Sequence, residues 1–125
     1  MDAEAIEDLF RPIGRVTIKR MFGGKGIYAD GVMFALETGG EIFLKTDDET
    51  RPAFEAAGLR PFIYKSPRGP TATSYWLLAD AAHDDEDELR CWCELALTAA
   101  RRKAAATPKK IAVKAGARKA PAKRA

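Results

Sequence analysis

The charge of this chain is divided into two parts, and this division limits where a folded core can form. Residues 101–125 contain ten Lys or Arg residues and no Asp or Glu. The whole chain has 21 basic and 18 acidic residues, so residues 1–100 keep 11 basic and 18 acidic ones. The first hundred residues therefore carry a net charge of −7, and the positive charge gathers at the C-terminal end.

The C-terminal segment is too poor in apolar residues to fold alone. After Lys103 it consists mainly of Ala, Lys, Arg and Pro, and its large apolar residues are Ile111 and Val113. Burial of so little apolar surface does not offset the conformational entropy lost on ordering a chain. We therefore predict one folded domain in residues 1–103 and a disordered basic tail in residues 104–125.

Hydrophobic periodicity predicts helices and strands in alternation within the folded part. Ile6, Leu9 and Phe10 have the spacing of one buried helix face. Asp30-Gly31 is typical of a two-residue hairpin turn. The expected elements are a helix over 2–11, strands over 16–28, 32–37 and 41–45, a helix over 46–57, strands over 61–65 and 73–78, and a helix over 84–103. This order, α-β(3)-α-β(2)-α, predicts an α+β fold with helices packed on an antiparallel sheet.

Two helix starts are predicted from capping patterns. Thr46 and Glu49 have the spacing of a capping box, which predicts that the second helix begins at Thr46. Five acidic residues, 84–88, suit the positive N-terminal end of the last helix. Residues 66–70 have the composition of a loop.

One stretch of the chain reads Arg20-Met21-Phe22-Gly23-Gly24-Lys25-Gly26-Ile27-Tyr28, followed by Asp30-Gly31-Val32-Met33-Phe34-Ala35. It resembles the signature of the TfoX/Sxy family, in its TfoX N-terminal domain. The resemblance continues, in the same order, with Ile42-Phe43-Leu44-Lys45-Thr46-Asp47, Phe54-Glu55-Ala56-Ala57-Gly58, Pro61-Phe62-Ile63-Tyr64, Tyr75-Trp76 and Trp92. The resemblance covers about residues 1–103. It implies a secretion-chaperone-like arrangement of the predicted elements. It also implies a regulatory role, because better-known members help a cyclic-AMP receptor-type activator switch on DNA-uptake genes.

The family motif has a structural interpretation. Its residues are Met21, Phe22, Gly23, Gly24, Gly26, Asp30 and Gly31. Gly24 to Ala29 also fits the loose dinucleotide pattern G-x-G-x-x-A, but that pattern binds a pyrophosphate only between a strand and a helix. A hairpin is expected here instead, so the glycines are interpreted as permitting a bulge or a tight strand crossing.

Catalytic and metal-binding patterns are weak in this sequence. His83 is the single histidine, and Ser66 and Ser74 have no base near them in any motif. Cys91 and Cys93 are two apart on a predicted helix, where a disulfide is strained and zinc lacks further ligands; Cys93 is interpreted as a core residue. We expect no catalytic residues, no cofactor and no metal.

The basic residues near the C-terminus predict weak, non-specific DNA binding through phosphate contacts. They are Arg101, Arg102, Lys103, Lys109, Lys110, Lys114, Arg118, Lys119, Lys123 and Arg124. If about six of them engage, the slope of log K against log salt is near −5. The alternative is a solvated tail that only improves solubility.

These observations favour a non-enzymatic regulatory or adaptor protein, whose folded body contacts a protein partner such as a transcription activator. The alternative is a small structural or ligand-binding domain with an incidental tail. An acidic N-terminus and the lack of about 18 consecutive apolar residues lead us to expect a cytoplasmic protein without membrane contact.

Overall fold

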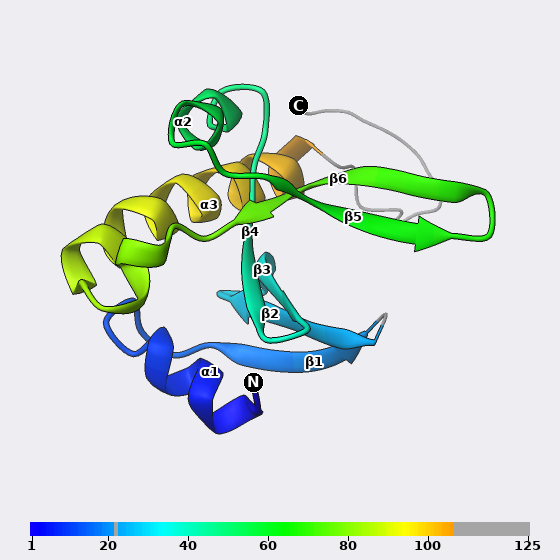
Figure 1. Cartoon of the computed structure of the whole chain (residues 1–125). Helices are drawn as coiled ribbons and strands as arrows, with labels where there is room; N and C mark the ends of the chain where they lie inside the picture. The colour runs from blue at the N-terminus through cyan, green and yellow to red at the C-terminus, as the bar shows by residue number, and fades with distance from the viewer. Residues whose placement is uncertain (22, 107–125) are drawn as a thin grey trace, which may run out of the picture.

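The structure is a computed structural model that describes residues 1–21 and 23–106. The elements are α1 (Ala3–Leu9), β1 (Thr17–Met21), β2 (Gly24–Ala29), β3 (Val32–Thr38), β4 (Glu41–Lys45), α2 (Arg51–Ala56), β5 (Pro61–Ser66), β6 (Gly69–Leu77), the 3-10 helix η1 (Asp80–His83) and α3 (Glu86–Ala106). They form one curved sheet with helices beside it (Figure 1). The predicted disorder of the tail falls on residues outside the described range, except that α3 continues to Ala106.

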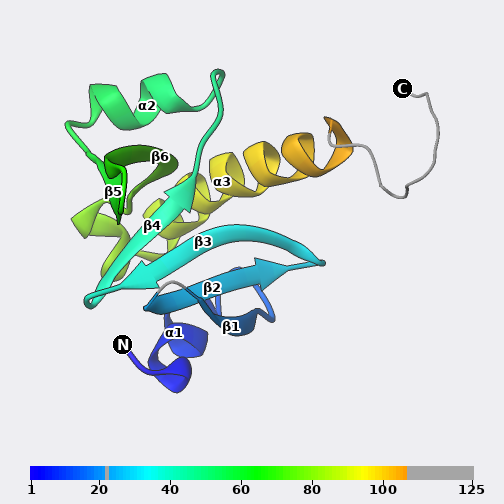
Figure 2. The same cartoon turned by 90° about the vertical axis from the view of Figure 1, so that its right-hand side faces the viewer.

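The six strands form an antiparallel sheet in the order β1-β2-β3-β4-β6-β5. The first four follow one another as a meander. The connection through α2 then carries the chain past one position, so that β5 lies at the edge and β6 returns beside β4. In Figure 2, α3 runs behind β3 and β4. The predicted α+β class, with helices on an antiparallel sheet, is confirmed.

The prediction of one strand over residues 16–28 is wrong, because the chain reverses within it. Met21 pairs with Gly24 and Thr17 pairs with Tyr28, so β1 and β2 form a hairpin. Gly23 has a φ of +76°, a backbone conformation that glycine adopts without the steric cost of a side chain. The glycines were interpreted as permitting a bulge or a tight strand crossing, whereas Gly23 makes a turn.

The predicted turn at Asp30-Gly31 is confirmed, with φ of +52° and +81°. A β-bulge also occurs in this hairpin, between Ile27 and Tyr28, one residue past Gly26. Ile27 pairs with Ala35 and Tyr28 pairs with Met33, which leaves Phe34 as the extra residue. The bulge helps to turn Phe34 into the core, where it is fully buried.

The predicted helix start at Thr46 is wrong, because Thr46 is still held by the sheet. Its backbone N–H and its hydroxyl both donate to the Ser74 carbonyl oxygen, at 2.7 and 2.8 Å. Asp47 takes over the local capping role: its Oδ1 accepts from the backbone N–H of Glu49 and Thr50. The helix α2 then begins at Arg51.

Two other boundaries also move. The predicted loop over residues 66–70 shrinks to a turn, because Ser66 pairs with Gly69 and β6 begins there. The helix α3 begins at Glu86, and the Asp85 carboxylate accepts from the N–H of Asp87 at 2.8 Å, as expected for a helix-capping acid.

The core lies between the sheet and the helices. Its members come mainly from α1, from β2, β3 and β4, and from α2 and α3. The fully buried ones include Ile6, Phe10, Ile27, Phe34, Ile42, Leu44, Phe54, Cys93 and Ala96. Phe10 of α1 meets Phe34 edge-on, with ring centroids 5.3 Å apart. The predicted packing of Cys93 in the core is confirmed, and Cys91 is exposed.

Candidate anion and nucleic-acid interface

Two glycines of the family motif, Gly24 and Gly26, lie on β2, where side chains would collide with the neighbouring strands. A Cβ at Gly24 would clash with the backbone carbonyl oxygen of Glu37. A Cβ at Gly26 would lie 2.8 Å from the terminal methyl of Met21 and 3.2 Å from that of Met33. The strand is followed by a hairpin turn and β3, so the dinucleotide pattern lacks the helix that it needs. Phe22 lies outside the described residues.

One face of the sheet is turned away from the core. Leu44 and Trp76 pack with the core residues of the helices, and strand side chains alternate between faces. The next residues, Lys45 and Tyr75, which pair across β4 and β6, therefore point to the opposite side. By the same alternation this opposite side, called here the open face, carries Lys19, Tyr28, Phe43, Lys45 and Tyr75.

Lysines and tyrosines lie side by side on the open face. The Lys19 ammonium is 4.9 Å from the centroid of the Tyr28 ring, and the Lys45 ammonium is 5.3 Å from that of Tyr75. Such cation–π contacts attract through the quadrupole of the ring. Burial, followed by the nearby Tyr28, raises the pKa of Tyr75 to about 12, which keeps its hydroxyl protonated and able to donate.

The Lys45 side chain is charged although the residue is almost fully buried. The residue is only 9% exposed, and its Nζ donates to the Ser74 hydroxyl at 2.5 Å. Burial lowers the pKa of the Lys45 ammonium and the charge of Lys103 lowers it further, whereas Asp47 acts in the opposite direction. Ser74 thus lies against a cationic donor rather than a base, and the expectation that no sequence motif places a base beside Ser74 is unchanged.

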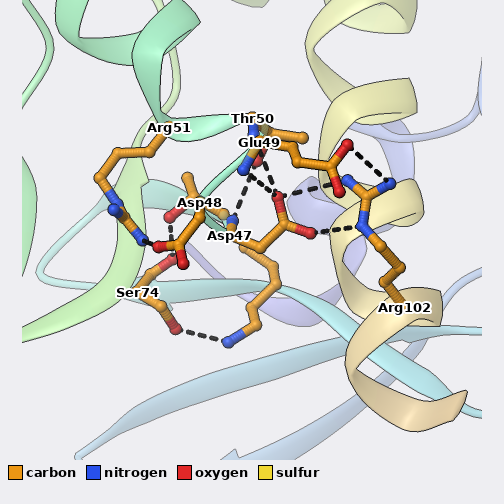
Figure 3. A network of polar contacts seen from close by, with 9 residues as sticks. Asp47, Asp48, Glu49, Thr50, Arg51, Ser74 and Arg102 are labelled. Carbon is orange, nitrogen blue, oxygen red and sulfur yellow. Dashed lines mark hydrogen bonds and ion pairs between the residues drawn. The ribbon is translucent and has the colours of Figure 1, made fainter. Parts of the chain in front are cut away.

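A second polar cluster fixes the C-terminal end of α3 (Figure 3). Arg102 Nε donates to Asp47 Oδ2 at 2.7 Å, and its Nη1 lies 3.6 Å from Glu49 Oε1. The bond from Arg102 lowers the pKa of the Asp47 carboxyl to about 2 in spite of its burial, with help from the N–H of Thr50. We call the contact between Asp47 and Arg102 the α3 latch.

The predicted DNA-contacting residues divide into two groups. Arg101 and Arg102 lie on α3 and pair with body carboxylates, Arg101 with Asp30 at 3.4 Å. Lys103 also lies on α3. The other seven, Lys109, Lys110, Lys114, Arg118, Lys119, Lys123 and Arg124, lie outside the described residues.

The sequence did not predict the two most specific contacts of this region. Lys45 and Ser74 are 29 positions apart, and Asp47 and Arg102 are 55 positions apart. Neither spacing belongs to a local motif. The sequence feature that could have pointed to these contacts is Lys45-Thr46-Asp47, a run of polar residues directly after the apolar residues of a strand.

His83 lies on η1 and is exposed. It lines a shallow hollow of about 350 Å³ between α1 and the start of α3, together with acidic residues such as Asp8 and Asp84. No group of three His, Cys, Asp or Glu side chains within residues 1–21 and 23–106 is placed to hold a metal ion. None of the described helices is long and apolar enough to cross a membrane.

The fold and this region define a small α+β domain whose sheet has one face packed against helices and one face turned away from them. The chain belongs to the TfoX N-terminal domain family, whose model matches residues 8–100. A comparison with curated proteins finds no match.

Proposed function

We propose that this protein is a non-enzymatic regulatory adaptor of the competence-regulator type, which holds a protein partner near DNA. In this proposal the folded body binds the partner, a transcription activator being the kind that the family suggests. The basic residues after α3 contact the DNA backbone. The phosphate contacts supply affinity without reading sequence, so specificity comes from the partner.

The observation that carries the proposal is the separation of charge along the chain. Residues 107–125 have seven Lys or Arg and no Asp or Glu, whereas residues 1–106 have 14 basic and 18 acidic residues. A body with a net negative charge is repelled by the DNA phosphates, whereas seven basic residues in a segment without Asp or Glu are attracted to them. Two of the basic residues before this segment, Arg101 and Arg102, already have acidic partners on the body.

The α3 latch supports the proposal from the body's side. Arg101 pairs with Asp30 and Arg102 with Asp47, which ties the last turns of α3 to the β2–β3 turn and to the end of β4. The basic segment therefore begins close to a fixed point of the domain. When this segment contacts DNA, a partner bound to the body is held near the DNA, at a distance set by the length of the segment.

The test is DNA binding by the full chain and by two full-length variants, measured by fluorescence anisotropy with a labelled duplex of arbitrary sequence. One variant has all seven basic residues of 107–125 changed to Gln. The control has four exposed basic residues of the body changed to Gln: Arg15, Arg20, Lys65 and Arg68. We expect the first variant to lose at least about tenfold in affinity at low salt and the control to change little. Equal losses would refute the assignment of DNA contact to the tail.

A second candidate function, ligand binding by the domain itself, is favoured by the surroundings of Lys45. It does not depend on the tail and leads to the following inference.

A further inference from the structure

Lys45 is a buried cation whose contacts are incomplete. An ammonium has three N–H donors. Among the described residues, Lys45 makes one hydrogen bond, to the neutral Ser74 hydroxyl, and no carboxylate oxygen lies within 4 Å of its Nζ. Buried charges in proteins are normally paired, because an unpaired one loses hydration without compensation.

The acid that acts on the charge of Lys45, Asp47, is already bound by other groups. Asp47 is close enough to raise the pKa of the ammonium, but Arg102 binds its carboxylate and two backbone N–H groups also donate to it. The positive charge of Lys103 lies near Lys45 as well and opposes its ionisation. Lys45 therefore keeps its charge without a carboxylate partner among the described residues.

The two residues that contact this charge, Ser74 and Tyr75, carry hydroxyls with unused hydrogen-bonding capacity. The Ser74 oxygen accepts from Lys45, so its own proton is free to be donated to a third group. The Tyr75 hydroxyl makes no hydrogen bond to the described part of the chain, although the side chain is half-buried. Its ring lies under the Lys45 ammonium, and the ring and ammonium share the open face.

We propose that Lys45, Ser74 and Tyr75 form a binding site for a phosphate-type oxyanion. The chemistry that these groups share is donation: the Lys45 ammonium, the Ser74 hydroxyl that it contacts and the Tyr75 hydroxyl can each donate a hydrogen bond to an anion. A lysine binds phosphate as a point charge, and hydroxyls complete the coordination of its oxygens. The anion is either the phosphate of a small phosphorylated molecule or a phosphate of the nucleic-acid backbone.

The argument for this site does not rest on the proposed function. Seven basic residues after α3 bind DNA in that proposal, whereas the oxyanion site lies on described strands. Loss of one does not remove the other.

The test is a titration of the full chain with inorganic phosphate at constant ionic strength, followed by the backbone amide signals of Lys45, Ser74 and Tyr75 in NMR spectra. We expect saturable shifts at these three residues. The Lys45→Met variant should weaken phosphate binding at least about tenfold, because it removes the charged donor. The matched control is Lys19→Met. Lys19 also lies on the open face with its ammonium over a tyrosine ring, but no hydroxyl is described as accepting from it. This variant should leave the shifts unchanged.

A second variant keeps the test decisive if Lys45→Met does not fold. Tyr75→Phe removes only a hydroxyl that has no described partner, so the fold should remain, and phosphate binding should weaken roughly threefold to tenfold. Absence of saturable shifts in the wild type overturns the proposal. It is also overturned if Lys45→Met and Lys19→Met bind phosphate equally well.

The same variants distinguish the two sources of the anion. If the anion is a backbone phosphate, Lys45→Met lowers the affinity of the full chain for DNA and reduces the salt slope by about one. If it is a small phosphorylated molecule, Lys45→Met loses the response to phosphate but keeps its DNA affinity, and a mononucleotide should then shift the same amide signals.

Discussion

Replacement of Asp47 by Asn separates the two roles of this carboxylate. Its Oδ1 accepts from the N–H of Glu49 and Thr50, at 3.1 and 3.0 Å, and its Oδ2 accepts from Arg102 Nε at 2.7 Å. An Asn side chain keeps one carbonyl oxygen for the two backbone N–H groups. It loses the negative charge and the Oδ2 acceptor, so Asp47→Asn reduces the α3 latch to the longer 3.3 Å contact of Arg102 Nη2 with Oδ1 and retains the turn.

The expected cost follows from the exposure of the pair. The side chains of Arg102 and Asp47 are 42% and 26% exposed, so water and salt screen their attraction in part. A pair of this kind contributes up to about 1 kcal/mol to the free energy of unfolding. Asp47→Ala also removes the capping of the turn, which adds roughly 1 kcal/mol. For a domain of this size, 1 kcal/mol lowers Tm by about 4–8 °C.

The pH dependence has a definite sign. The pKa of Asp47 is lowered from 3.8 to about 2 in the folded protein, so the folded state favours the ionised form. The resulting stability is fully present above the unfolded pKa of 3.8 and is lost as the pH falls toward 2. The difference between wild type and Asp47→Asn is therefore largest near neutral pH and shrinks below pH 3.8.

The assay is urea unfolding of the wild type, Asp47→Asn, Arg102→Gln and the double variant, at pH 7 and at pH 2.5. A double-mutant cycle at pH 7 should give a coupling of about 0.5–1 kcal/mol between the two residues. At pH 2.5 the coupling should be much smaller. Additive single variants at pH 7, or a coupling that persists unchanged in acid, would refute the reasoning.

Three further predictions concern the rest of the domain. Glu37→Gln should lower the free energy of unfolding by about 1–2 kcal/mol and remove the part of it that is lost in acid, as measured by urea unfolding between pH 7 and pH 3. Burial raises the pKa of the Glu37 carboxyl, but hydrogen bonds from the N-terminal ammonium and the Gly40 N–H outweigh burial and bring the pKa below its usual value. Gly24→Ala should cost about 1–3 kcal/mol through its clash with a backbone carbonyl, and Gly26→Ala less than about 1 kcal/mol because flexible methionine ends can move, measured by thermal unfolding. A maleimide should modify the exposed Cys91 in the native protein and reach Cys93 only on unfolding, since burial raises the Cys93 pKa to about 12; equal labelling of both thiols would contradict this.

The helices and hairpins that rest on local patterns could be predicted from the sequence. Ile6 and Phe10 at helical spacing are both buried, and Asp30-Gly31 makes its turn. In these cases one periodicity or one turn dipeptide decides the structure. The Gly23-Gly24 pair was harder, because a glycine pair fits both a bulge and a reversal, and the pairing of β1 with β2 decides between them.

The polar contacts could not be predicted, because residues far apart in the sequence make them. Thr46 has the spacing of a helix cap, but the sheet holds it against Ser74. That preference depends on the position of β6 beside β4, which no local pattern contains. Arg102 looked like one more cation for DNA, and only the fold brings it to Asp47.

The dependence of DNA affinity on salt tests the central claim most directly. The full chain should bind duplex DNA weakly, with a dissociation constant of about 10⁻⁴ to 10⁻⁶ M, and log K should fall with log salt at a slope near −5. The variant without the seven basic residues of 107–125 should lose most of this slope. A slope near zero for the full chain, or an unchanged slope in the variant, would contradict the account of an adaptor held on DNA by its basic C-terminal segment.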